Sequence, residues 1–265
     1  MFINLCNLYA FQYSLISFAK EKFKCMIELS DRIKSMEESA TIAMSRKSRE
    51  LNALGKDVIS LSLGEPDFNT PDFIKDAAKE GMDQNYTKYM AVPGYEDLRE
   101  SISRKFLRDN NLHYSTDQIV VSTGAKQSIA NVVLTLINPG DEVIIPCPYW
   151  VSYIEIVKLA GGIPVFVPSS IENDFKITGE QLQNAITEKT KLMIFSSPCN
   201  PTGSVYSKNE LEDLAKVIEN NASLMVICDE IYEHINFIGK HESLAQFSNV
   251  YDQVIPVYGG FKSMG

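Results

Sequence analysis

Two short polar motifs and one lysine carry the side chains whose types and spacing in this sequence could do chemistry. The motifs read SPCNPTG over residues 197–203 and CDEIY over residues 228–232, and each follows a run of aliphatic residues. Along the chain they offer an amide, a carboxylate, a phenol and a primary amine, which belong to Asn200, Asp229, Tyr232 and Lys262. Groups of these types can hold a charged ring and move protons on it.

The four groups are what a protein needs to hold pyridoxal phosphate. A primary amine binds this cofactor as a Schiff base and later moves protons at the substrate Cα, and we expect Lys262 to be that amine. A carboxylate against the pyridine nitrogen keeps the ring protonated, a role that suits Asp229. Tyr232 and Asn200 are expected to donate hydrogen bonds to the 3′-oxygen, whereas Glu230 is expected to face solvent. Catalysis is thus assigned to Lys262, Asp229 and Tyr232.

Each of these residues has an ordinary structural alternative when it is taken singly. Asp229 after a strand is a common helix cap, Asn200 before proline is a common turn residue, and Lys262 near a chain end is usually solvated. Their order and spacing along one chain favour the cofactor interpretation over the three separate alternatives.

The motifs resemble those of the class I/II pyridoxal-phosphate-dependent aminotransferases, in particular the aspartate aminotransferase-like branch of fold type I. The resemblance runs from about residue 29 to Lys262. It implies that Gly64, in the loop LGEPDF, contacts the substrate together with Trp150 and Asn200. It also implies that Tyr89 reaches across a dimer interface to the cofactor phosphate of a second copy, so a homodimer is expected.

A turn that opens a helix is expected to bind the cofactor phosphate. Residues 122–126 read STGAK, and small residues let the backbone approach an anion that the helix dipole favours. The resemblance assigns Gly124, Ala125 and Lys126 to the phosphate. It also stacks Trp150 on the pyridine ring, for which a hydrophobic anchor at a helix start is the alternative.

Short apolar runs alternate with amphipathic stretches from residue 58 onward, which predicts an α/β fold with a mostly parallel, buried sheet. The resemblance specifies a three-layer sandwich, the large domain of fold type I. Because ligands bind beyond the carboxyl ends of parallel strands, both motifs are expected at one rim. A charged helix is expected over Leu29–Leu51, outside the sheet. The expected strands are Val58–Leu63, Gln118–Ser122, Glu142–Pro146, Ile163–Pro168, Leu192–Ser196, Leu224–Asp229 and Gln253–Val257, and the expected helices are Gln127–Leu136, Trp150–Ala160, Gly179–Ala185 and Lys208–Asn220.

The 265 residues are expected to form an N-terminal extension over 1–28, an arm or part of a small domain over 29–57, and a cofactor-binding large domain over 58–265. A net charge of −9 argues against a nucleic-acid partner, which requires a basic surface. Five cysteines without C-x-x-C spacing, and three histidines without ligand spacing, predict a reduced cytoplasmic protein with no metal site. Polar residues interrupt the apolar N-terminus, so neither a secretory signal nor a membrane span is expected.

Together these features predict a ping-pong transaminase that takes an L-amino acid and a 2-oxo acid, with aspartate and 2-oxoglutarate expected. Aromatic, alanine or methionine transaminases and related lyases share the motifs and stay open. The resemblance also implies a C-terminal small domain with a substrate-binding arginine, which the sequence lacks after Gly265. An inactive or unstable fragment, or a pseudoenzyme, is therefore the alternative, and an unrelated α/β binding module is a third.

Overall fold

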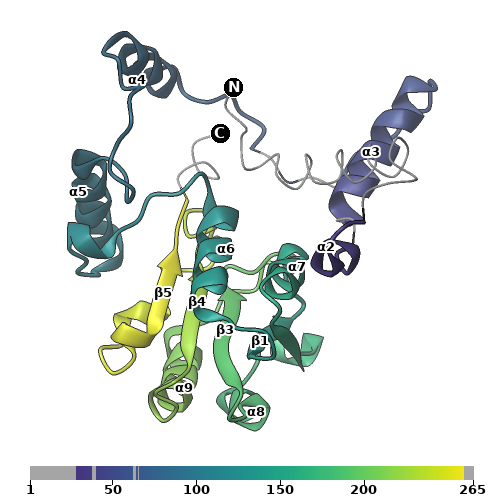
Figure 1. The fold of residues 1–265 in the computed structure, drawn as a ribbon, viewed down its shortest axis with the longest axis vertical. Coiled ribbons are helices and arrows are strands. Elements are labelled where there is room, and N and C mark those ends of the chain that lie inside the picture. Colours follow the sequence, from purple (N-terminus) through teal and green to yellow (C-terminus); the bar gives the residue numbers. More distant parts are fainter. Residues whose placement is uncertain (1–27, 38–39, 62–63, 65, 260–265) are drawn as a thin grey trace.

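The computed structural model describes residues 28–37, 40–61, 64 and 66–259. Figure 1 shows a sheet with helices on both sides and further helices that project away from it. The helices are α2 (Asp31–Lys34), α3 (Ala40–Ala53), α4 (Asp72–Asp83), α5 (Glu96–Lys105), α6 (Ala125–Leu136), α7 (Ser152–Leu159), α8 (Gly179–Ala185) and α9 (Lys208–Glu219), and the strands are β1 (Glu142–Cys147), β2 (Ile163–Pro168), β3 (Thr190–Ser196), β4 (Met225–Asp229) and β5 (Val254–Val257).

The five strands pair in the order β2-β1-β3-β4-β5, and every pair is parallel. Near-continuous Val, Ile and Leu runs suit such a sheet, because both of its faces are buried. The register aligns Ser196 with Asp229 and Asp229 with Val257, so the last residues of three neighbouring strands lie side by side. This confirms the predicted α/β class with a parallel central sheet.

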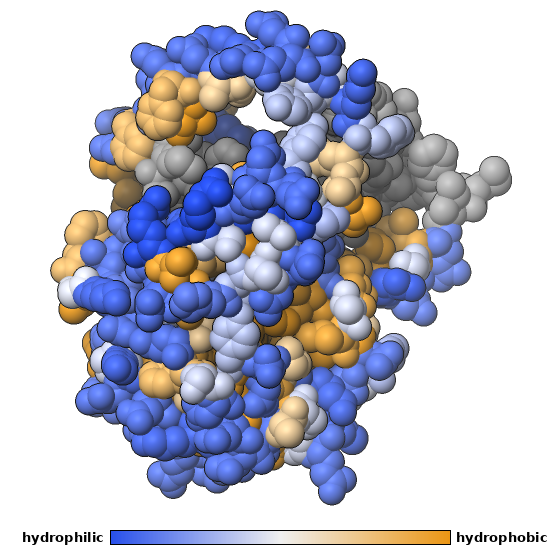
Figure 2. Space-filling model, turned by 90° about the vertical axis from the view of Figure 1, so that its left-hand side faces the viewer, coloured by the Kyte–Doolittle hydropathy of each residue, from blue (hydrophilic) through white to orange (hydrophobic). Residues whose placement is uncertain are grey.

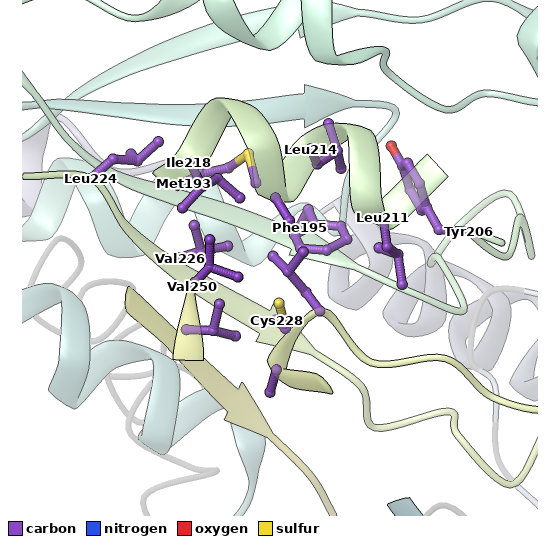
Figure 3. Close-up of a cluster of buried hydrophobic side chains, with 14 of the residues drawn as sticks. Met193, Phe195, Tyr206, Leu211, Leu214, Ile218, Leu224, Val226, Cys228 and Val250 are labelled. Carbon is purple, nitrogen blue, oxygen red and sulfur yellow. The ribbon is translucent and has the colours of Figure 1, made fainter. Parts of the chain in front are cut away.

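Alternate strand residues supply two separate hydrophobic cores, as the period of two along a strand requires. Ile145, Ile194 and Ile227 pack on the side of α6 and α7. Met193, Phe195 and Val226 pack on the opposite side, against Leu211, Leu214 and Ile218 of α9. Figure 3 shows these side chains of β3 and β4 beside the α9 residues. The helices that pack on the two faces of the sheet therefore fix the positions of the strand ends.

Helices α8 and α9 begin where the sequence provides capping boxes. The Thr178 hydroxyl accepts a hydrogen bond from the Gln181 backbone, and the Gln181 side chain accepts one from the Thr178 N–H. Ser207 and Glu210 repeat the pattern at the start of α9. These caps satisfy N–H groups that have no partner within the helix, which fixes where each helix starts.

Two predicted strands are wrong within the described residues. Residues 58–61 form no strand, and Ile59 and Leu61 are exposed, whereas residues 62–63 lie outside the described part of the chain. Residues 119–122 form no strand either, because the Val121 N–H donates to the Pro93 carbonyl at 3.0 Å. A Cβ on Gly94 would lie only 2.9 Å from the Val121 Cβ, so this segment packs on a turn.

The single helix predicted over Leu29–Leu51 is also wrong. The described residues form the short helix α2 and the separate helix α3, because the helical hydrogen bonds of α2 end at Ser35. The Glu37 N–H instead donates to the buried Glu155 carboxylate of α7 at 3.1 Å. Figure 1 shows α3 projecting away from the sheet, as expected for a charged helix outside it. Among the described helices, none is long and apolar enough to cross a membrane.

Two isoleucines in strands test how much the sheet's burial stabilises the fold. Ile227 in β4 is fully buried, whereas Ile163 at the start of β2 is 46% exposed. We expect Ile227→Ala to lower the free energy of unfolding by about 2–5 kcal/mol, because it leaves a cavity between packed layers. The matched control Ile163→Ala should cost less than about 1 kcal/mol. Chemical denaturation measures both, and equal losses would contradict the two-layer core.

Candidate functional site

The site is built at the rim where the parallel strands end. The chain order moves from β1 outward to β2 and then returns to β3, so the connections diverge between β1 and β3. Ligands of open α/β sheets bind at such a point. The loop after β1 carries Trp150 and the loop after β3 carries Asn200. The Cys199 thiol lies 3.7 Å from the Pro148 carbonyl, which brings the two loops together.

Asp229 is the last residue of β4 and is 5% exposed. Its Oδ2 accepts a hydrogen bond from the Tyr153 hydroxyl at 2.6 Å, and its Oδ1 accepts one from the Ile231 N–H at 3.4 Å. Burial raises the pKa of the Asp229 carboxyl, while these two hydrogen bonds act in the opposite direction. A buried carboxylate with one strong donor can hold a cationic group that approaches from the rim.

Tyr153 is the site residue that the sequence analysis missed. It lies in the first turn of α7, is 1% exposed, and shares its face with Ile156 and Val157. Burial first, then the neighbouring Asp229 charge, raises its pKa well above the ordinary value, so the phenol stays protonated and donates. The available signal was the carboxylate predicted at the end of a buried strand, which requires a buried donor.

Asn200 and Tyr232 form the second pair of the site. The Asn200 Nδ2 donates to the Tyr232 hydroxyl at 3.4 Å, across the rim between the loops after β3 and β4. The pKa of Tyr232 is raised by burial and lowered in part by this amide. The Asn200 loop closes on itself, because the Gly203 N–H donates to the Cys199 carbonyl and the Cys199 N–H to the Ser204 carbonyl. The pair thus presents an amide and a phenol to one position.

The predicted phosphate turn lies at the N-terminus of α6. Gly124 is the N-cap residue with φ +103°, and open space surrounds the position where a Cβ would lie. Only glycine adopts this conformation readily, and the helix N-terminus attracts an anion. The Lys126 ammonium lies 4.9 Å from the centre of the Trp150 ring, which in turn meets Tyr153 edge to face at 5.5 Å. These contacts link the turn to Asp229.

The donor set fits pyridoxal phosphate group by group. Asp229 suits a protonated ring nitrogen, Asn200 and Tyr232 suit a phenolic oxygen, and the Trp150 face suits an aromatic ring. The α6 N-terminus, where Gly124, Ala125 and Lys126 lie, suits a phosphate. The structure therefore brings most of the predicted cofactor-binding residues to one rim.

The remaining predicted residues are not brought there by the described contacts. Lys262 lies outside the described residues. Gly64 and Tyr89 are both exposed, and neither appears among the contacts of Asp229 or Asn200 given above. Glu230, which we expected to face solvent, is instead 2% exposed, so that prediction is wrong. Strand alternation turns Glu230 away from Asp229 and into the opposite layer, where hydroxyl donors satisfy its carboxylate.

Comparison with known proteins shows what this chain resembles. Residues 56–265 match the family described as aminotransferase class I and II. An aspartate aminotransferase of Bacillus sp. (strain YM-2) is 50% identical over 238 residues, which are 89% of this chain and 60% of that protein. An aspartate/prephenate aminotransferase of Cereibacter sphaeroides is 50% identical over 212 residues, or 80% of this chain and 53% of that protein.

Solved structures agree with this likeness. The crystal structure of the aspartate aminotransferase from Rhizobium meliloti superimposes with a TM-score of 0.87 at 36% identity, covering 90% of this chain and 60% of that one. The Thermus thermophilus aspartate aminotransferase with maleate gives a TM-score of 0.86 at 40% identity, covering 90% and 62%. The chain therefore spans 53% to 62% of the length of these four relatives.

The burial of Asp229 predicts a definite dependence of stability on pH. Because burial raises the folded-state pKa of Asp229, ionisation of this carboxyl lowers the stability of the fold. This loss of stability is absent below the pKa of an unfolded aspartate, and it reaches its full size once the pH has risen through the folded-state pKa. Asp229→Asn should therefore gain stability over the unsubstituted chain as pH rises from about 4 to 7, by on the order of 1 kcal/mol. Urea unfolding at both pH values measures this, and a pH-independent difference would contradict it.

Removal of the Tyr153 hydroxyl should instead lower the stability of the fold, and by more at pH 7 than at pH 4. Tyr153→Phe keeps the ring against Trp150 but removes the donor that favours the charged form of Asp229. We expect a loss of about 1 kcal/mol at pH 4 and about 1–3 kcal/mol at pH 7, because hydrogen bonds to charged groups are stronger. Tyr206→Phe is the control, since its buried hydroxyl accepts from the Ile177 N–H and contacts no carboxylate in the hydrogen bonds described. Its loss should be the same at both pH values.

Proposed function

The chain belongs to the class I and II aminotransferase family, and on that basis we propose that it binds pyridoxal phosphate and transfers the amino group of an L-amino acid to a 2-oxo acid. The observation that carries the proposal is the buried Asp229 carboxylate with the Tyr153 hydroxyl donating to it at 2.6 Å. The neighbouring Asn200–Tyr232 pair and the glycine turn of α6 give the same rim an oxygen-binding and an anion-binding part.

Each residue then has a separate task. The cofactor, when bound, supplies a protonated ring that accepts the electrons of the substrate Cα–H bond. Asp229 holds the proton on the ring nitrogen, and Tyr153 keeps the Asp229 carboxylate in its acceptor form. Asn200 and Tyr232 donate to the ring oxygen, while Trp150 covers the ring face. Lys262 is proposed as the amine that binds the cofactor covalently and moves the proton from the substrate Cα.

A dicarboxylic amino acid is the proposed donor. The Bacillus relative is named an aspartate aminotransferase, and the Thermus thermophilus relative was solved with maleate, a four-carbon dicarboxylate. We propose aspartate and 2-oxoglutarate in a ping-pong scheme, in which the first oxo acid leaves before the second binds. The name of the Cereibacter relative makes prephenate a second candidate acceptor.

A homodimer is proposed from the apolar surface outside the sheet. Residues 59–92 expose Ile59, Leu61, Phe73, Tyr89 and Val92, each by more than 70%. Figure 2 shows apolar surface among polar side chains on the face where α4 and α5 lie. An exposed apolar area of this kind suits a subunit interface. We further propose that residues 29–57 form an arm or part of a small domain, that residues 58–265 form the cofactor-binding large domain, and that the protein is cytoplasmic.

The cofactor proposal is tested by trapping its covalent attachment. Incubation with pyridoxal phosphate followed by borohydride reduction should place a stable adduct on Lys262, which peptide mass spectrometry locates. Lys262→Ala should abolish the adduct and lower any transamination by about 10²–10⁴-fold, because proton transfer by a positioned group is lost. Lys189→Ala, at an exposed lysine before β3, is the matched control.

The outcome also separates the enzyme from an inactive fragment. An adduct on Lys262 together with amino transfer from aspartate to 2-oxoglutarate or prephenate supports the proposed function. A chain that folds but labels Lys189 and Lys262 equally would be a fragment without a formed cofactor site.

A further inference from the structure

A second carboxylate beside the site has no part in the functions assigned so far. Glu230 follows Asp229 directly and is 2% exposed. Its Oε1 accepts a hydrogen bond from the Ser243 hydroxyl at 2.6 Å, and its Oε2 lies 2.6 Å from the His241 Nε2. The Tyr258 hydroxyl also donates to Oε2. Three side chains from two separate segments thus converge on one buried carboxylate.

The same position is joined to the end of β5 through the backbone. The Glu230 N–H donates to the Val257 carbonyl at 2.9 Å, which extends the β4–β5 ladder by one residue beyond the strands. A Cβ on Gly259 would lie 3.1 Å from both Cγ1 and Cδ1 of Ile231, so the chain after β5 passes close over the residue that follows Glu230. Residues 257–259 therefore contact residues 230–231 in three independent ways.

The Tyr258 ring is held from its other side as well. It packs edge to face on Phe106 with ring centres 4.8 Å apart, and the Lys105 ammonium lies 4.4 Å from its centre. Lys105 in turn forms an ion pair with Glu233 of the loop after β4. Burial first, then the Glu230 charge, raises the Tyr258 pKa well above its ordinary value, so the hydroxyl remains a donor. The ring contacts hold Tyr258 against Phe106 and Lys105, and the hydrogen bond of its hydroxyl holds it beside Glu230.

We propose that Glu230 is a positioning residue that anchors the chain leaving β5, so that the segment leading to Lys262 starts beside Asp229. The proposal rests on the proposed role of Lys262. Lys262 is the third residue after Gly259, and three residue steps span at most about 11 Å. Anchoring of Tyr258 and Gly259 therefore limits the search of the lysine amine to the neighbourhood of the carboxylate that is to hold the cofactor ring.

The experiment compares Tyr258→Phe and Glu230→Gln with the control Tyr251→Phe. Tyr258→Phe keeps the ring contacts with Phe106 and Lys105 and removes only the hydroxyl. Tyr251 precedes β5 at its other end, and its hydroxyl donates to the His113 carbonyl at 2.5 Å. The control thus loses a tyrosine hydrogen bond to a backbone carbonyl at the opposite end of β5 and leaves the hydrogen bonds of Glu230 in place.

Two readouts are measured on the full chain. Hydrogen exchange of the Glu230 amide, without cofactor, should become about tenfold faster in Tyr258→Phe and Glu230→Gln and stay within twofold in the control. The ratio of pyridoxal phosphate–borohydride adduct at Lys262 to adduct at the exposed Lys189 should fall about tenfold in the same two variants only. If Glu230 and Tyr258 only stabilised the fold, the melting temperatures of all three variants would fall, and the ratio of Lys262 adduct to Lys189 adduct would stay unchanged.

The outcomes separate this inference from the proposed function. Unchanged exchange in Tyr258→Phe and Glu230→Gln overturns the anchoring by Glu230, whatever the labelling shows. Faster exchange with an unchanged labelling ratio, in a chain that labels Lys262, overturns the positioning role. Faster exchange in a chain that never labels Lys262 selectively supports the anchoring and contradicts the proposed cofactor function. Melting temperatures confirm that each variant is folded.

Discussion

The structure depends on the burial of a carboxylate at the end of a central parallel strand. Asp229 closes β4, and its environment is too apolar for an ionised group unless donors surround it. One donor, the Tyr153 hydroxyl, comes from the helix layer, and the backbone supplies another. Two hydrogen bonds leave acceptor capacity on the carboxylate, which is what a site for a cationic ring requires. A fully satisfied carboxylate here would stabilise the fold and bind nothing.

The surrounding architecture serves to keep this charge in place. Two hydrophobic layers, one with α6 and α7 and the other with α8 and α9, clamp the sheet from both faces. Because interiors pack closely, a strand in such a sheet does not shift without displacing many side chains. The loops after β1, β3 and β4 can then carry Trp150, Asn200 and Tyr232 as short extensions of rigid strands. Precision at the rim follows from packing beneath it.

Sequence reasoning succeeded where local pattern and tertiary role coincide. Ile163–Pro168 and Gly179–Ala185 agree with β2 and α8 at both ends, because an apolar run bounded by turn residues and a capping box both act locally. The motif residues Asn200, Asp229 and Tyr232 were found because they lie at or shortly after the ends of strands. Tyr153 was missed because its neighbours Ile156 and Val157 make it look like one more core residue. Residues 118–122 do not form a strand, because Gln118 ends a short 3-10 helix and the Val121 N–H donates to the Pro93 carbonyl of a nearby turn.

The two consecutive carboxylates at the end of β4 have a mechanical consequence. Strand alternation directs Asp229 toward Tyr153 in one layer and Glu230 toward Tyr258 in the other. Asp229 and Glu230 share one peptide bond, so a shift of β4 moves both carboxylates together. Asp229, the proposed partner of the cofactor ring, and Glu230, the proposed anchor of the chain leading to Lys262, therefore keep a fixed position relative to each other. The two carboxylates could move relative to each other only if the backbone bent between residues 229 and 230. A loosening of the sheet alone would not separate them.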